Sequence, residues 1–332
     1  MSTHTTRLID ARSPSDRADA AQQAAGILDA GGIVGLGTET VYGLAGDAAN
    51  GEAVARIYAA KGRPRFNPLI IHVLDLAMAR REARFPEAAE RLAAAFWPGP
   101  LTLVLPARDN CSASALARAG HDSIAIRRPG GFMADVIAAL GRPLVAPSAN
   151  RSGHVSATTA ADVLADLGGR IDAVVDSGGT DVGVESTILD LTGPVPCLLR
   201  PGGIAREALE AHLGMRLATA AQAPAAPKAP GMLSSHYAPR AGVRLNATEI
   251  RPGEAYLGFG GQVPEGPAPI AAIDLSPEKN LIEAAARLFQ ALRRLDETGA
   301  RSIAVAPIPD HGLGEAINDR LERAAAPRPA AE

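Results

Sequence analysis

Two hydrophobic patterns alternate along the first two thirds of the chain. Short runs rich in Val, Ile and Leu, bounded by Gly and Pro, are typical of buried strands, and they lie at residues 31–36, 68–73, 101–106, 123–126, 143–147, 173–176 and 186–191. Ala-rich stretches between these runs predict helices near residues 15–30, 51–60, 86–96, 132–140, 158–167 and 204–213. The alternation predicts a layered α/β domain with a mixed sheet over residues 10–214.

The pattern changes after residue 214. Residues 218–230 read ATAAQAPAAPKAP, a composition typical of a semi-rigid linker, and we place a linker segment over residues 215–240. Beyond it, the runs VRLNA, AYLGFG, IAAIDL and SIAVAPI predict strands. They surround one helix in which apolar residues recur at spacings of four and three: Leu281, Ala285, Leu288, Leu292 and Leu295. The sequence predicts a second, smaller α/β domain over residues 241–326.

Charge and composition limit the functions open to such a protein. The formal net charge of −3 gives the molecule as a whole no cationic field of the kind that drives nonspecific binding to nucleic acid. The two cysteines, Cys111 and Cys197, are far apart and form no CxxC or Cys/His cluster, which argues against a zinc site or a disulfide framework. The polar N-terminus and the lack of ~18 consecutive apolar residues lead us to expect a cytoplasmic protein without a membrane segment.

Polar clusters directly follow several predicted strands, where α/β sheets usually present ligand-binding groups. The first, GTETVYGLAGD at residues 37–47, is also compatible with a Gly-rich turn that caps a helix. The second brings Lys61, Arg63 and Arg65 together within five residues, beside Gly and Pro. Neighbouring cations repel one another, so this loop favours a polyphosphate partner, although a solvated basic loop is the alternative.

A third cluster, APSANRSG at residues 146–153, contains alternating Ser148 and Asn150. In an extended chain their side chains would point the same way, toward a ligand's ribose or carboxylate. Hydrogen bonds to their own backbone are the alternative. The chain contains no GxxxxGK[ST] sequence, so any nucleotide site is not of the P-loop type.

Seven segments, taken in order and spacing, resemble the YrdC/Sua5 family of threonylcarbamoyl-AMP synthases: TETVYGL, KGRPRFNPLIIHV, WPGPLTLVLP, SIAIRRP, APSANRSG, GVESTILDL and LLRPGG. The later segment APGMLSSHYAP, followed by a small α/β domain, resembles the longer Sua5 type. The resemblance therefore implies a YrdC-like layered domain with a twisted mixed sheet, followed by a Rossmann-like Sua5 domain.

The resemblance also implies roles for particular residues. Lys61, Arg63, Ser148 and Asn150 match the family's KxR…SxN signature, which makes Lys61 and Arg63 the expected catalytic cations. ATP is expected to meet Lys61, Arg65, Ser123, Asn150, Thr158, Arg200 and Tyr237. L-Threonine is expected to meet Thr38, His72, Arg127, Ser148 and Ser186. No protein ligand for a metal is implied, and Mg²⁺ is expected to accompany ATP.

The implied reaction joins L-threonine, bicarbonate or CO₂, and ATP into threonylcarbamoyl-AMP and pyrophosphate. Both bond-forming steps depend on positioning and on positive charge near phosphate, which fits clusters made of cations, hydroxyls and an amide. The product would pass to a tRNA threonylcarbamoyl transferase, whereas direct tRNA binding is not expected from an acidic chain with few aromatic residues. Two alternatives are a carbamoyl-adenylating enzyme for another acceptor and an RNA-binding module.

The segment between the domains is more polar than a simple spacer requires. Ser234, Ser235, His236 and Tyr237 lie together between two prolines. We expect this segment to fold back as a lid over the first domain, with Tyr237 near the ATP phosphates and water excluded from the carbamate. The alternative is a linker end that packs only on the second domain.

Overall fold

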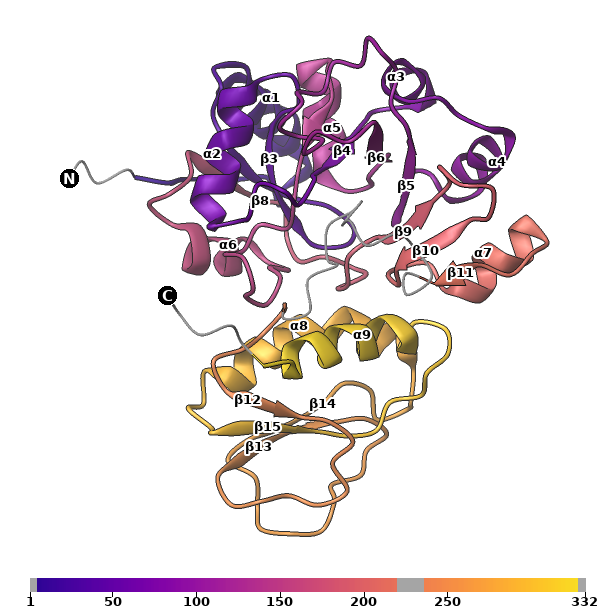
Figure 1. The fold of residues 1–332 in the computed structure, drawn as a ribbon. Helices are drawn as coiled ribbons and strands as arrows, with labels where there is room; N and C mark the ends of the chain where they lie inside the picture. Colours follow the sequence, from indigo (N-terminus) through magenta and orange to yellow (C-terminus); the bar gives the residue numbers. More distant parts are fainter. Residues whose placement is uncertain (1–4, 220–235, 328–332) are drawn as a thin grey trace.

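The structure is a computed structural model that describes residues 5–219 and 236–327, and it contains two sheets (Figure 1). The larger sheet has the strand order β1-β8-β2-β3-β7-β4-β6-β5-β9-β10-β11. Its strands are β1 (Arg7–Asp10), β2 (Val34–Gly37), β3 (Tyr42–Asp47), β4 (Ile70–His72), β5 (Leu101–Pro106), β6 (Ser123–Arg127), β7 (Leu144–Val145), β8 (Ala173–Asp176), β9 (Thr187–Asp190), β10 (Cys197–Arg200) and β11 (Ala218–Thr219). Strand β6 is parallel to β4 and antiparallel to β5, so the predicted mixed sheet is confirmed.

The helices of the first domain lie between its strands along the chain, and α2 begins and ends at clear sequence signals. They are α1 (Pro14–Asp29), α2 (Gly51–Lys61), α3 (Leu76–Glu82), α4 (Glu87–Phe96), α5 (Phe132–Leu140), α6 (Ala160–Leu167) and α7 (Arg206–Leu213). Helix α2 starts after Asn50, whose side chain accepts hydrogen bonds from two backbone N–H groups of the first turn. It ends at Gly62, which adopts a left-handed φ of 61° that glycine tolerates well. Lys61 is consequently the last helical residue, and Arg63 lies just beyond the turn.

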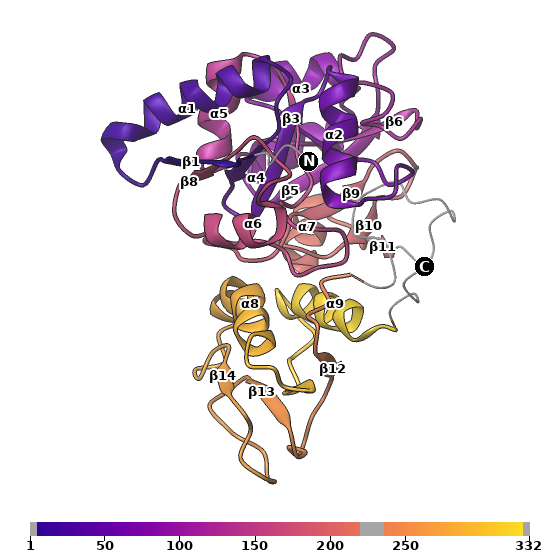
Figure 2. The same cartoon turned by 90° about the vertical axis from the view of Figure 1, so that its left-hand side faces the viewer.

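The second domain has a smaller sheet with helices on the side of the first domain. Its strands are β12 (Gly242–Arg244), β13 (Glu254–Gly258), β14 (Ala272–Asp274) and β15 (Ser302–Val305), in the order β12-β15-β13-β14. All of its pairs are parallel. Helices α8 (Leu281–Asp296) and α9 (Gly314–Ala325) lie between this sheet and the first domain in both views (Figures 1 and 2). The predicted apolar stripe of α8 is buried at Ala285, Leu288, Leu292 and Leu295.

Several elements were not predicted from the sequence. Helices α3 and α9 have no counterpart in the predicted pattern. Strand β3 occupies part of the polar cluster at residues 37–47, and the short strand β11 lies in the predicted linker. Residues 220–235, including Ser234 and Ser235, are outside the part of the chain that the structure describes.

Candidate active site

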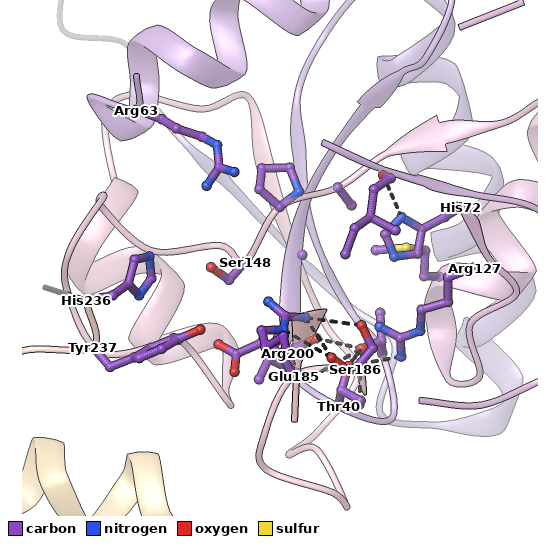
Figure 3. A pocket seen from close by; sticks show the side chains of 17 residues that line it. Thr40, Arg63, His72, Arg127, Ser148, Glu185, Ser186, Arg200, His236 and Tyr237 are labelled. Atoms are coloured by element: carbon purple, nitrogen blue, oxygen red, sulfur yellow. Dashed lines mark hydrogen bonds between the residues drawn. The ribbon is translucent and has the colours of Figure 1, made fainter. Parts of the chain in front are cut away.

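One cavity collects the polar side chains that follow the strands of the large sheet (Figure 3). Its empty volume is about 540 Å³, which includes space open to solvent. Strands β4 and β6 are parallel neighbours whose last residues, His72 and Arg127, are register partners, so both side chains reach the cavity from the same sheet edge. The polar residues that line it are Thr38, Thr40, Arg63, His72, Arg127, Ser148, Glu185, Ser186, Arg200, His236 and Tyr237.

All five residues expected to meet threonine line this cavity: Thr38, His72, Arg127, Ser148 and Ser186. They come from five separate segments of the chain, so the fold brings together what the sequence spreads over almost 150 positions. The hydroxyl of Thr38 is already engaged in its own turn, where it donates to the carbonyl of Val41 at 2.7 Å. Thr38 therefore shapes the loop that follows β2 as well as lining the cavity.

The cavity has a positively charged wall. Arg63, Arg127 and Arg200 line it, whereas Glu185 is the single carboxylate among its lining residues in the described part of the chain. Each guanidinium is fixed by the protein; Arg200, for example, donates through Nη2 to the carbonyl of Ser186 at 2.8 Å. Burial lowers the pKa of Arg63 to about 10, so this side chain remains a cation at neutral pH. Such a wall is suited to carboxylate and phosphate groups.

Arg127 is held in place from two sides. Its Nη2 forms an ion pair with Glu39 at 2.7 Å and donates to the hydroxyl of Thr40 at 3.0 Å. Its Nε donates to the carbonyl of Gly99 at 3.1 Å. The side chain is thus oriented before any ligand enters, which lowers the entropic cost of binding an anion.

His72 is a neutral ring in this setting. Burial, reinforced by the nearby charge of Arg127, lowers the pKa of His72 to about 3. Its Nδ1 lies 3.2 Å from the carbonyl of Ile70, which can only accept, so we assign the proton to Nδ1. The other nitrogen, Nε2, is then an acceptor available for a ligand's hydroxyl or amine.

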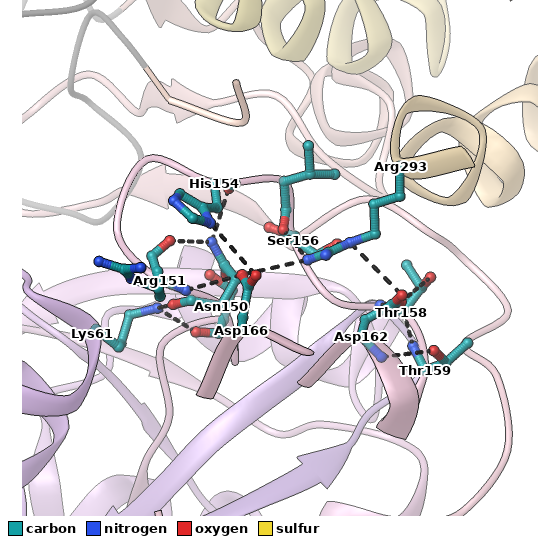
Figure 4. A network of polar contacts seen from close by, with 12 residues as sticks. Lys61, Asn150, Arg151, His154, Ser156, Thr158, Thr159, Asp162, Asp166 and Arg293 are labelled. Carbon is teal, nitrogen blue, oxygen red and sulfur yellow. Dashed lines mark hydrogen bonds and ion pairs between the residues drawn. The ribbon is translucent and has the colours of Figure 1, made fainter. Parts of the chain in front are cut away.

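Lys61 does not line the cavity. It belongs to a network of polar contacts that includes Asn150 (Figure 4). Its Nζ donates to the backbone carbonyl of Ser148 at 2.5 Å and to that of Asn150. Burial, together with the charge of Arg63, lowers the pKa of Lys61 well below its ordinary value. Lys61, the last residue of α2, therefore holds the loop at residues 146–153 in place through two hydrogen bonds.

The sequence left open whether Ser148 and Asn150 face a ligand or bond the local backbone, and the structure shows one residue in each arrangement. Ser148 lines the cavity, whereas the side-chain amide of Asn150 donates to the carbonyls of Arg151 and His154, both at 2.8 Å. The chain bends here, so the expected common direction of the two side chains does not apply. The Oδ1 of Asn150 is buried without a hydrogen-bond partner among the described residues.

The remaining residues expected to meet ATP are spread around this centre. Arg200 and Tyr237 line the cavity, but Arg65, Ser123 and Thr158 do not. Arg65 is exposed, and Thr158 donates to Asp162 at 3.3 Å. Ser123 begins β6, four residues before Arg127 and so about 13 Å from it along the strand.

Sequence reasoning missed three polar residues of the cavity. Thr40 and Glu185 lie within the matched segments TETVYGL and GVESTILDL, and His236 within the polar group at residues 234–237, so membership of these segments was the available signal, but none of the three was assigned a ligand. Burial opposes ionisation of Glu185, yet Arg320 and Arg200, together with a hydrogen bond from Ser156, lower the pKa of Glu185 to about 2. Its two oxygens accept from Ser156 Oγ at 2.5 Å and from Arg320 Nε at 2.9 Å.

The described residues place two further limits on the protein. Within residues 5–219 and 236–327, no group of three or more His, Cys, Asp or Glu side chains could hold a metal ion. In the same part of the chain, no helix is both long and apolar enough to cross a membrane.

Comparison with known proteins supplies an independent assignment. Residues 26–202 match the Sua5/YciO/YrdC family, described as "Telomere recombination", and residues 204–326 match "Threonylcarbamoyl-AMP synthase, C-terminal domain". The chain is 39% identical to a threonylcarbamoyl-AMP synthase of Bacillus subtilis over 92% of this chain and 93% of that protein. It is 40% identical to the Pyrococcus abyssi enzyme of the same name, over 91% and 92% of the two chains.

Among solved structures, that of P. abyssi Sua5 complexed with L-threonine superimposes with a TM-score of 0.88 at 36% identity, covering 96% of this chain and 98% of the other. Both sheets and both domain types are thus matched together. The chain belongs to the Sua5/YrdC family of threonylcarbamoyl-AMP synthases, in its long form with the C-terminal domain.

Proposed function

We propose that this protein is an L-threonylcarbamoyladenylate synthase that binds threonine in the cavity of Figure 3. The observation that carries this proposal is the convergence of all five threonine-assigned side chains on one positively charged cavity. The similarity to P. abyssi Sua5, solved with L-threonine, supports the same substrate. The enzyme would use ATP and bicarbonate or CO₂ as its other substrates.

The cavity offers a partner for each polar group of threonine. The substrate's carboxylate would bind the guanidinium of Arg127, which the protein has already oriented. Its hydroxyl would donate to Nε2 of His72, since the hydroxyl of Thr38 is occupied within its own turn. Ser148 and Ser186 would complete the contacts from the opposite segments.

The reaction then needs two bonds to form in sequence. The neutral threonine amine attacks the carbon of CO₂ and releases one proton to the solvent, which gives a carbamate. A carbamate oxygen attacks the α-phosphorus of ATP, the bond from that phosphorus to the β-phosphate oxygen breaks, and pyrophosphate leaves. Ordering of the three reactants and the positive charge of Arg63 and Arg200 near the phosphates lower the barriers to these steps.

Mg²⁺ would enter as the MgATP complex. Glu185, the carboxylate of the cavity wall, is already engaged by Ser156 and Arg320 through its two oxygens. A magnesium ion in this site is therefore best held by the phosphates and water, which is how Mg²⁺ commonly binds with nucleotides. The ion would neutralise part of the triphosphate charge.

The loop that Lys61 ties down is the proposed floor for the phosphates. Arg63 would contact them directly, while Lys61 would act on them through the positions of Ser148 and Asn150. The unpaired Oδ1 of Asn150 is a candidate acceptor for the nucleotide. If the nucleotide extends beyond the cavity, its more distant parts would contact Arg65, Ser123 and Thr158.

The product implies a downstream partner. Threonylcarbamoyl-AMP is a mixed anhydride that water destroys, so an acceptor enzyme must consume it promptly. We propose a tRNA threonylcarbamoyl transferase in this role, with no direct binding of tRNA by this acidic chain.

Pyrophosphate release with each substrate omitted in turn tests the proposal. We expect release to require ATP, L-threonine and bicarbonate together, and serine to be used about 10- to 200-fold less well because it lacks one methyl group. Equal release without threonine would contradict the assignment. Release with carbamoyl phosphate in place of threonine and bicarbonate would favour a different acceptor, and strongly salt-dependent RNA binding without turnover would favour an RNA-binding module.

A further inference from the structure

One arginine of the second domain is completely buried against the wall of the cavity. Arg320 of α9 has an exposed fraction of 0%. Its Nε donates to Glu185 at 2.9 Å, and its Nη1 donates to the carbonyl of Pro201 at 2.8 Å and to Asp319 at 2.7 Å. Glu185 and Pro201 belong to the first domain, so this side chain joins the two domains at the cavity.

The same guanidinium lies over the ring of Tyr237, with its carbon 5.2 Å from the ring centroid. Phe289 of α8 stacks on that ring, at 5.5 Å between centroids and an interplanar angle of 26°. Tyr237 is 1% exposed and has a φ of 60°, a conformation that non-glycine residues rarely adopt. The surroundings must hold such a residue in place, and the second domain supplies both the guanidinium and the stacked Phe289 ring, while the ring of the adjacent His236 contacts the Tyr237 ring edge-on.

Tyr237 is also anchored along its backbone. The N–H of the preceding residue, His236, donates to the carbonyl of Arg323 in α9, at 3.2 Å. The N–H of the following residue, Ala238, donates to the carbonyl of Gly153 in the first domain, at 2.8 Å. We call residues 236–238 the strap: it crosses from one domain to the other and carries two cavity-lining side chains.

The ion pair of Arg320 with Glu185 links Arg320 to the residues expected to bind threonine. Glu185 directly precedes Ser186, whose hydroxyl and carbonyl accept hydrogen bonds from Arg200. Burying an ion pair seldom adds stability over an apolar pair, because both charges lose their hydration. What such a pair can supply is one defined geometry, since its hydrogen bonds form in a single arrangement.

We propose that Arg320 is a positioning residue of this enzyme, which sets the place of the strap and of Glu185 in the cavity wall from the second domain. The assignment rests on the proposed function, in that it takes this cavity as the active site. Arg320 itself does not line the cavity. It acts through Tyr237 on one side and Glu185 on the other.

The position of Tyr237 can be measured without reference to activity. The chain has four tyrosines, so protein labelled with 3-fluorotyrosine gives four ¹⁹F resonances, and Tyr237→Phe assigns the one that matters. The variants are Arg320→Met, which keeps much of the volume but removes the charge, and Arg320→Lys, which keeps the charge without the planar fork. The matched control is Arg287→Met in α8, where the arginine forms an exposed ion pair with Glu283 within the second domain.

We expect Arg320→Met to change the chemical shift of the Tyr237 resonance, while the other three resonances stay in place. The displaced ring should also become accessible to a dissolved gadolinium chelate, which would broaden its resonance. The kcat/KM of threonine-dependent pyrophosphate release should fall about 10- to 100-fold, as for a displaced catalytic wall. Arg320→Lys should show smaller changes of the same kind. Arg287→Met should change neither the spectrum nor the kinetics.

An unmoved Tyr237 resonance in Arg320→Met would overturn the proposal, whatever happens to activity. If that variant does not fold, as judged by circular dichroism, Arg320→Lys decides by the same criterion. Wild-type protein without threonine-dependent pyrophosphate release would instead defeat the proposed function, and the spectra would still decide whether Arg320 positions the strap.

Discussion

Two histidines of the cavity wall are neutral because they are buried. Burial and Arg127 lower the pKa of His72 to about 3. Burial also lowers that of His236 to about 3, where Arg63 and Lys61 add to the effect and Glu185 opposes it. In the unfolded chain both rings would take up a proton near pH 6.5. Stability from this source is therefore complete above pH 6.5 and is lost as the pH falls toward 3.

Acid titration of stability tests this interpretation. Between pH 6 and pH 5 we expect each of the two histidines to reduce the free energy of unfolding by about 1.2 kcal/mol. Replacement of one, His72→Gln, should remove about half of their joint contribution to the slope. Urea titrations at several pH values above 5 measure it, since Glu185, with its pKa lowered to about 2, contributes mainly below that range. A slope equal to that of the wild type would contradict a neutral buried His72.

At this scale the sequence predicted chemical types better than contacts. The cations of the cavity, most of its hydroxyls and His72 were named from matched segments, because each is fixed in type by its motif. What the sequence did not reveal is which polar atoms the protein itself already uses. Lys61 was expected to await a phosphate, yet its Nζ is bound by two backbone carbonyls. Those carbonyls lie almost 90 positions away, beyond the reach of local patterns.

At the scale of elements, the sequence predicted helices and strands with a regular pattern of apolar residues. It did not predict β3 or α9, whose buried positions include glycine or a charged residue. Strand β3 is buried along its whole length, but its glycines made it resemble a turn. A Cβ at Gly43 would lie 2.9 Å from Met133 and 3.1 Å from Ala146, so close packing explains that glycine. Helix α9 was not predicted because its buried face includes a charged residue, Arg320. In both cases contacts with distant parts of the chain, rather than the local sequence pattern, determine the secondary structure.

The tie between α2 and the loop at residues 146–153 gives a prediction about one element acting on another. We expect Lys61→Met to cost about 1–3 kcal/mol of stability, because two buried carbonyls lose their donor. Hydrogen exchange of the loop, followed by mass spectrometry, should accelerate, starting with the amide of Ser152 that donates to the carbonyl of Lys61.

The matched control is Arg56→Met, in the same helix, where the side chain pairs with Asp172 and does not touch the loop. Its loop should exchange at the wild-type rate. If Lys61→Met also exchanged like the wild type, the loop would be held by other contacts, and the proposed indirect action of Lys61 on the phosphates would fail.

At the scale of the whole molecule, the two domains share apolar packing as well as charge. Val41, Val155 and Val184 of the first domain are buried in the same cluster as α8 and α9. Arg206 of α7 pairs with Glu315 of α9. Composition predicted a division between the domains at residues 215–240, but it contained no information on how the domains pack. The residues of the ion pairs Arg206–Glu315 and Arg320–Glu185 across the interface are more than 100 positions apart.

This arrangement predicts what the first domain can do alone. Its main core consists of residues between 9 and 217, so a chain ending after Thr219 should keep its secondary structure and retain β11. Threonine-dependent pyrophosphate release should nevertheless fall about 100-fold or more, since the strap and Arg320 are missing. Circular dichroism checks folding, and the full chain assayed in parallel is the reference. Full activity in the shortened chain would show that the first domain closes its own site.

The strand order of the large sheet has a consequence for how the chain is made. Among the described residues, β1 pairs only with β8 in that order, and Ala173, the partner of Arg7, follows it by 166 positions. At translation rates of about 5–20 residues per second, β1 leaves the ribosome roughly 8–33 s before its partner is synthesised. Pairing over so long a separation is also intrinsically slow. Among the described strands, β1 is thus the one that waits longest for its sheet partner, and its edge stays open to wrong partners meanwhile.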